Sequence, residues 1–148
     1  MNFRIQRLAL ATLFLAGICG QASAVCSDSG RTQIADPTAL TTALSGNIVC
    51  VGSGPIWQNQ EIHQPGGTLT DYKMGLGDPV DPTKNIGTWG VSGTGTDTVV
   101  TYNYTGVGVY TFKVFNNGTD QFFAFCEIDG TTVNTVGKRI VGGLGPCV

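Results

Sequence analysis

Apolar and polar residues alternate most regularly between residues 98 and 128, with the two-residue period of β-strands. Three segments carry this pattern: TVVTYNYT, VYTFKVF and QFFAFCEI. The loop TGVG joins the first two, and Asn117-Gly118, a strong hairpin-turn signal, separates the second from the third. The pattern therefore predicts an antiparallel meander. The side chains expected to share a face are Val100, Tyr102 and Tyr104 in the first strand, and Tyr110, Phe112 and Val114 in the second.

Shorter apolar segments earlier in the chain predict further strands at 47–52, 68–74 and 86–91. One segment predicts a helix: Asp36 can cap its start, Pro37 suits its first turn, Leu40 and Leu44 lie four residues apart, and Gly46 can end it. The predicted fold is all-β, an antiparallel meander forming a sandwich or partly closed barrel, with one short N-terminal helix and two disulfides.

The first 24 residues have the pattern of a secretory signal peptide. Arg4 and Arg7 precede the apolar run LALATLFLAGIC, and Ala-Ser-Ala at 22–24 provides a cleavage site. The run is shorter than the roughly 20 apolar residues that a membrane-spanning helix needs. We therefore expect a signal peptide over 1–24, cleavage near Ala24, and a single β domain over 25–148 that is secreted or periplasmic.

The mature chain has few charges and a negative balance. Without Arg4 and Arg7, six basic residues remain against ten acidic ones, and only Lys138-Arg139 are adjacent. Nucleic acids and anionic membrane surfaces are bound by clustered lysine and arginine. We therefore expect neither a nucleic-acid partner nor stable membrane insertion.

Cys26, Cys50, Cys126 and Cys147 remain after removal of the signal peptide. An even number of cysteines in an exported chain predicts disulfides, and none of these has the spacing of a zinc site. Two pairings are open: Cys26–Cys50 with Cys126–Cys147, which closes short loops, or Cys50–Cys126 with Cys26–Cys147. We expect no metal and no cofactor.

The segment IWQNQEIH contains the only histidine of the chain. If it is a strand, Trp57, Asn59, Glu61 and His63 lie on one face. Pairing across the following turn allows two registers, one with Glu61 opposite Thr70 and Asn59 opposite Tyr72, the other with Glu61 opposite Asp71. The first is favoured because it keeps two carboxylates apart.

This face supports several interpretations. An aromatic ring beside amide, carboxylate, imidazole and the Tyr72 phenol suits a polar ligand such as a sugar or a peptide. Glu61 and His63 alone give too few ligands for a metal site, and an ordinary half-exposed strand would carry the same residues. Trp89 is expected to be buried.

We therefore expect an exported, non-enzymatic module that binds a polar small molecule or a protein. One alternative is a small hydrolase using Glu61 and His63, since a nucleophile would depend on the only histidine. The other is a self-assembling subunit that associates through an edge strand of the meander.

Six segments in this order resemble a family of small secreted bacterial proteins: LTTALSGNIVC, WQNQE, DYKMGLGDPVDP, GTWGVSG, VVTYNY and FAFC. The resemblance covers most of the mature chain, and Asp-Tyr-Lys and Asp-Pro-Val-Asp-Pro are its most specific parts. Members of the family carry Glu-Glu-His where this chain has Glu61-Ile62-His63, so the second acidic position is absent. The resemblance implies one exported bacterial domain and carries no catalytic residue to this chain.

Overall fold

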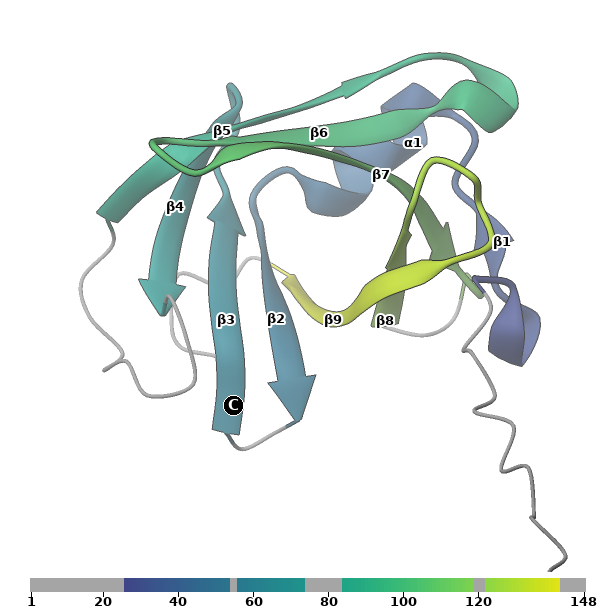
Figure 1. Ribbon diagram of the computed structural model, residues 1–148, viewed down its shortest axis with the longest axis horizontal. Helices are drawn as coiled ribbons and strands as arrows, with labels where there is room; N and C mark the ends of the chain where they lie inside the picture. Colours follow the sequence, from purple (N-terminus) through teal and green to yellow (C-terminus); the bar gives the residue numbers. More distant parts are fainter. Residues whose placement is uncertain (1–25, 54–55, 74–83, 119–121, 142–148) are drawn as a thin grey trace, which may run out of the picture.

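The computed structural model describes residues 26–53, 56–73, 84–118 and 122–141, and it is a closed antiparallel barrel (Figure 1). Each of the eight strands β2 to β9 pairs with the next along the chain, and β9 pairs back with β2. The all-β expectation and the short helix are confirmed, and the sheet closes fully. The strands are β1 (Thr32–Gln33), β2 (Asn47–Ser53), β3 (Ile56–His63), β4 (Thr68–Lys73), β5 (Lys84–Ser92), β6 (Val99–Tyr104), β7 (Gly108–Asn116), β8 (Phe122–Cys126) and β9 (Val133–Val141).

The sequence pattern missed two strands, β1 and β9. In β9 the apolar alternation is interrupted by Gly137 and by Lys138-Arg139, so the segment does not look like a strand in isolation. It becomes one because it fills the gap between β2 and β8 and closes the barrel. A side-chain Cβ at Gly137 would lie 2.5 Å from Cγ1 of Val49, so this closure requires a glycine there.

The helix α1 (Pro37–Leu44) has the predicted caps. The Asp36 carboxylate accepts a hydrogen bond from the backbone N–H of Thr38 at 2.8 Å, and Gly46 has the positive φ that ends such a helix. The other helical segments among the described residues are two short 3-10 turns, η1 (Asp28–Gly30) and η2 (Gly95–Asp97). None of the helices in the described part of the chain is both long and apolar enough to cross a membrane. The predicted signal peptide over 1–24 lies outside the described residues.

Leu40 and Leu44 of α1 are fully buried over one end of the barrel. The helix contacts β2 and β5 and leads directly into β2, so it covers the end where β2 begins and β3 finishes. There its two leucines pack into the main apolar cluster, which includes Leu69, Trp89 and Val100. Trp89 is 8% exposed, as expected for a buried tryptophan. This end of the barrel is filled; we call it the filled end.

The disulfide seen among the described residues joins Cys26 to Cys126, so both of the expected pairings are wrong. Closing a short loop costs the unfolded chain less entropy, which favours pairs of cysteines close in sequence. The observed bond instead joins two cysteines that are 100 residues apart. The fold makes it possible because the backbone N–H of Cys26 donates to the carbonyl of Thr131, which holds the N-terminal segment against the β8–β9 turn. Cys50 is disulfide-bonded as well, and Cys147 lies outside the described residues.

The two clearest sequence strands are not free edges of a sheet. β6 pairs with β5 and β7, and β7 pairs with β6, β8 and β1. The pairing of β7 with β8 covers only Lys113 to Phe115, so residues 108–112 pair with β6 alone among the described strands. Because both strands have neighbours on both sides in the closed barrel, fewer of their backbone N–H and C=O groups are left to pair with another copy of the chain.

Candidate functional site

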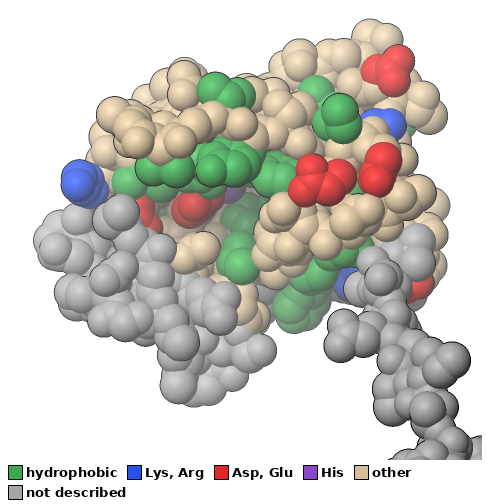
Figure 2. All heavy atoms as spheres, in the orientation of Figure 1, with side chains coloured by type: hydrophobic (Ala, Val, Ile, Leu, Met, Phe, Trp, Pro, Cys, Tyr) green, Lys and Arg blue, Asp and Glu red, His purple; other side chains and the backbone are tan. Residues whose placement is uncertain are grey.

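A cavity of about 380 Å³ occupies the other end of the barrel, which we call the hollow end. In Figure 2 it opens beneath a band of hydrophobic side chains, and Glu61 is the acidic residue among the described residues that line it. A cavity of this size suits a small organic ligand. The residues that line it are Val49, Val51, Asn59, Glu61, His63, Tyr102, Tyr104, Tyr110, Phe112, Phe125, Asn134 and Thr135.

Three residues of the predicted binding face, Asn59, Glu61 and His63, lie together on this wall. They come from alternate positions of β3, as the two-residue period requires. The side chains of the other two candidates, Trp57 and Tyr72, lie outside the described part of the structure. The described part of the predicted face, Asn59, Glu61 and His63, is therefore on an inner wall of the barrel.

Sequence reasoning missed the opposite wall, which is aromatic. It correctly placed Tyr102 and Tyr104 on one face of β6, and Tyr110 and Phe112 on one face of β7. Nothing in the alternation indicated that these faces lie across a cavity from β3. That proximity follows from the order of strands around the closed barrel, which a single sequence does not reveal.

The favoured register between β3 and β4 is wrong. Glu61 pairs with Asp71, His63 pairs with Leu69, and an irregularity follows Gln60. The prediction rested on repulsion between two charged carboxylates, which applies only when both are ionised. Burial changes that condition for Glu61, and Asp71 is itself only 7% exposed.

Glu61 is half-buried and holds its proton unusually tightly. Burial raises the pKa of Glu61 from 4.5 to about 7, and the charge of Asp71 adds to the effect. The Tyr104 hydroxyl opposes it by donating to both carboxylate oxygens of Glu61, at 3.0 Å each. Near neutral pH the side chain is therefore divided between its acid and carboxylate forms. A neutral Glu61 also removes the repulsion that disfavoured the observed register.

His63 lies deeper and is fully buried at the boundary between the two ends. Its Nε2 and the Tyr102 hydroxyl are 2.9 Å apart, and its ring makes edge contacts with Trp89 and Tyr102 at centroid distances of 5.2 and 5.5 Å. Burial lowers the pKa of His63 from 6.5 to about 4. The imidazole is therefore neutral at physiological pH and is part of the packed interior.

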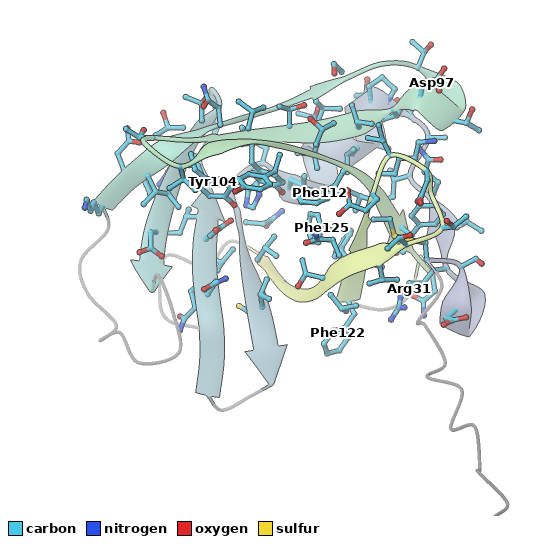
Figure 3. All side chains as sticks on the ribbon, in the orientation of Figure 1. Arg31, Asp97, Tyr104, Phe112, Phe122 and Phe125 are labelled. Carbon is cyan, nitrogen blue, oxygen red and sulfur yellow. A yellow bond between two sulfur atoms is a disulfide. The ribbon has the colours of Figure 1, made fainter. Side chains whose placement is uncertain are left out.

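Aromatic rings surround the remaining space. Figure 3 shows Tyr104, Phe112 and Phe125 pointing into the interior between the upper strands β6–β7 and the lower strand β9. Tyr102 stacks on Tyr104 at 6.0 Å, and Tyr110 meets Tyr104 edge-on at 5.8 Å. Such arrangements favour flat or cationic ligands through the faces of the rings.

The mouth of the cavity lies where the barrel wall is least continuous. Because β8 pairs with β7 only from Lys113 to Phe115, the first half of β7 stands away from β8 and β9. Tyr110 of β7 is 45% exposed there, and Asn134 and Thr135 of β9 line the same cavity. A second cavity of about 260 Å³ shares Asn59, Glu61 and Tyr104 with the first, and it adds Asp71 and Lys84.

The arrangement gives little support to catalysis through the histidine. His63 is fully buried, and its Nε2 is engaged by Tyr102. A general base needs access to the proton that it removes. Within the described residues, no group of three His, Cys, Asp or Glu side chains is placed to hold a metal ion.

The fold and the site together define a class: a closed eight-stranded antiparallel barrel with an internal, partly aromatic cavity. Comparison with protein-family models, with curated proteins and with solved structures finds no match for this chain.

Proposed function

We propose that this protein is an exported, non-enzymatic binding protein that holds a small ligand in the hollow end of its barrel. The observation that supports this most directly is the 380 Å³ cavity, whose wall combines aromatic rings with polar groups. Tyr104–Glu61 and Tyr102–His63 are side-chain pairs already fixed by hydrogen bonds. Such preorganised groups lower the entropy cost of binding.

The compartment belongs to the same proposal. The signal-like N-terminus and the resemblance to small secreted bacterial proteins support export, and the Cys26–Cys126 disulfide is consistent with an oxidising environment. A binding protein outside the cytoplasm meets its ligand in solution, so an open mouth on the barrel is an advantage.

Blocking the cavity tests the proposal. Val51 lines the cavity, so Val51→Trp places a large side chain inside it, whereas Val109→Trp adds the same side chain at a position 63% exposed. We expect tryptophol, a neutral indole alcohol, to bind the wild type saturably and to shift the NMR resonances of cavity residues. Val51→Trp should abolish this binding, and Val109→Trp should preserve it.

A second blocking variant, Thr135→Phe on β9, keeps the test possible if Val51→Trp does not fold. Saturable binding that survives both folded blocking variants would contradict the location of the site. The absence of saturable binding to the wild type would contradict the proposed function.

A hydrolase remains the second candidate, with different residues. Glu61, with a pKa of about 7, pairs across the strands with Asp71, and an acid beside a second carboxylate is the pattern of glycoside hydrolysis. Turnover of 4-nitrophenyl glycosides that is lost in both Glu61→Gln and Asp71→Asn would favour it. A lack of turnover across such a panel would favour the binding protein.

We also propose that Cys50 pairs with Cys147 in the mature protein. The Cys26–Cys126 bond leaves these two cysteines once the signal peptide is removed, and Cys50 is fully buried in β2. Mass spectrometry of a non-reduced digest should find one peptide pair joined through them. Alkylation of both thiols without reduction would contradict the pairing.

A further inference from the structure

We propose that the hollow end selects a ligand that carries a protonated amine on a flat apolar body, with the amine placed against Glu61. This names the ligand class of the site and rests on the proposed function above. It depends on three features of the cavity: its charge, its aromatic wall and the hydrogen bond that restrains one carboxylate.

The charge of the cavity is one-sided. Glu61 is the acidic residue on its wall, and the described lining includes no lysine or arginine. The interactions of Glu61 are with the Tyr104 hydroxyl and with the charge of Asp71, neither of which is a cation. An ammonium group would therefore supply the opposite charge that this carboxylate lacks, and an anionic ligand would be repelled.

The aromatic wall is suited to the same group. The rings of Tyr102, Tyr104, Tyr110, Phe112 and Phe125 line the cavity. Ring faces carry partial negative charge and attract ammonium ions, and the attraction is stronger in a site shielded from water. The same rings provide flat apolar surface for the body of the ligand.

The carboxylate is also held in place. The single hydroxyl proton of Tyr104 is shared between both oxygens of Glu61, which limits the movement of the carboxylate while further lone pairs stay available. A charge-assisted hydrogen bond from an amine to a carboxylate held in this way is stronger than one between neutral groups.

Binding of an amine is then coupled to the ionisation of Glu61. The titratable groups of the described structure that face it are His63 on its own strand, Asp71 on β4, Tyr102 and Tyr104 on β6, and Tyr110 on β7, with Lys84 of β5 lining the adjoining cavity. The amine pairs with ionised Glu61, so affinity should fall as the pH drops below about 7, by about ten-fold in total, and should level off above 7. Near pH 7 binding should release roughly half a proton.

Three indoles that differ in charge test the proposal: tryptamine is a cation, tryptophol is neutral and indole-3-acetate is an anion. Isothermal titration calorimetry of the full mature protein should show tryptamine binding about ten-fold or more tightly than tryptophol, and indole-3-acetate most weakly. Titrations in buffers of different ionisation enthalpy report the proton released.

Glu61→Gln should reduce tryptamine affinity to the level of tryptophol and leave tryptophol binding within about two-fold. Asp97→Asn is the matched control, because it removes the same charge from an exposed turn, η2, outside the cavity lining (Figure 3). It should leave both affinities unchanged.

The outcomes separate the two proposals. If tryptophol binds as tightly as tryptamine, or if Glu61→Gln retains the preference for tryptamine, the amine selectivity is overturned while the cavity remains a binding site. If none of the three indoles binds saturably, the proposed function fails, and the amine selectivity fails with it.

Discussion

The filled end and the hollow end of the barrel are formed by the same strands, but their interiors differ. At the filled end, Leu40 and Leu44 of α1 pack among Leu69, Trp89 and Val100 and are fully buried. At the hollow end, a cavity of about 380 Å³ remains, with Glu61 on its wall. The helix accounts for the difference, because it contributes large aliphatic side chains at one end only.

The buried ionisable groups Glu61 and His63 also have different surroundings. Both Glu61 and His63 are shifted toward their neutral forms by burial. His63 lies on the same wall but is fully buried and contacts the rings of Trp89 and Tyr102, whereas Glu61 is half-buried on the cavity wall, where a ligand could restore its charge. The comparison favours a structural role for His63 and is compatible with the proposed binding role of Glu61.

The largest predicted effect is at the filled end. Leu44→Ala should lower the free energy of unfolding by about 2–5 kcal/mol, because it leaves a cavity in close-packed surroundings. Urea unfolding measures this loss. Val109→Ala, at a position 63% exposed, should change stability by no more than about 0.5 kcal/mol. Equal effects of the two variants would contradict the distinction between the ends.

The next effect concerns the free energy of unfolding, to which Glu61 and His63 contribute with opposite dependence on pH. Glu61, with its raised pKa of about 7, contributes stability that is present below about pH 4.5 and is lost as the pH rises through 7. His63, with its lowered pKa of about 4, contributes stability that is present above about pH 6.5 and is lost as the pH falls through 4. Each contribution is at most roughly 3 kcal/mol, and the two oppose each other between about pH 4.5 and 6.5.

Single substitutions should expose each contribution. Relative to wild type, Glu61→Gln should gain stability as the pH rises from about 4.5 to 7, because the destabilising ionisation is gone. His63→Gln should gain stability relative to wild type as the pH falls from about 6.5 to 4. Urea unfolding across this pH series measures both differences. Parallel curves for all three proteins would show that neither group is shifted.

The smallest effect compares the two tyrosine hydroxyls. Tyr102→Phe removes the partner of a fully buried His63 nitrogen, so it should cost about 1–3 kcal/mol. Tyr104→Phe removes the partner of half-buried Glu61 beside the open cavity, and we expect a cost below about 1 kcal/mol. Thermal or urea unfolding at pH 7 decides between them. A larger loss for Tyr104→Phe would reverse the assignment of structural and binding roles.

Local signals in the sequence predicted the local elements well. Asp36, Pro37 and Gly46 defined α1, and alternation located β2 and β4 to β8 within a few residues. Alternation also placed Asn59, Glu61 and His63 on one face of β3. These signals depend on neighbours a few residues apart, so they are readable without knowledge of the fold.

The errors came from distant contacts. The Cys26–Cys126 bond and the pairing of Glu61 with Asp71 were both disfavoured by reasoning suited to an unfolded or solvated chain. In the folded barrel, the N-terminal segment is held against the β8–β9 turn, and burial keeps Glu61 largely neutral below about pH 7. Strand β9 was missed for the same reason, because its pairing partners create it.

The sequence by itself determined most of the segments that become strands, where the helix begins and ends, and which residues of β3 share a face. Only the tertiary structure decided that this face is an inner wall and that the rings of Tyr104 and Phe112 lie across from it. The physical reason is that alternation assigns each side chain to one of two faces, whereas closure of the barrel determines which faces meet, how much space they enclose and whether a carboxylate there keeps its proton.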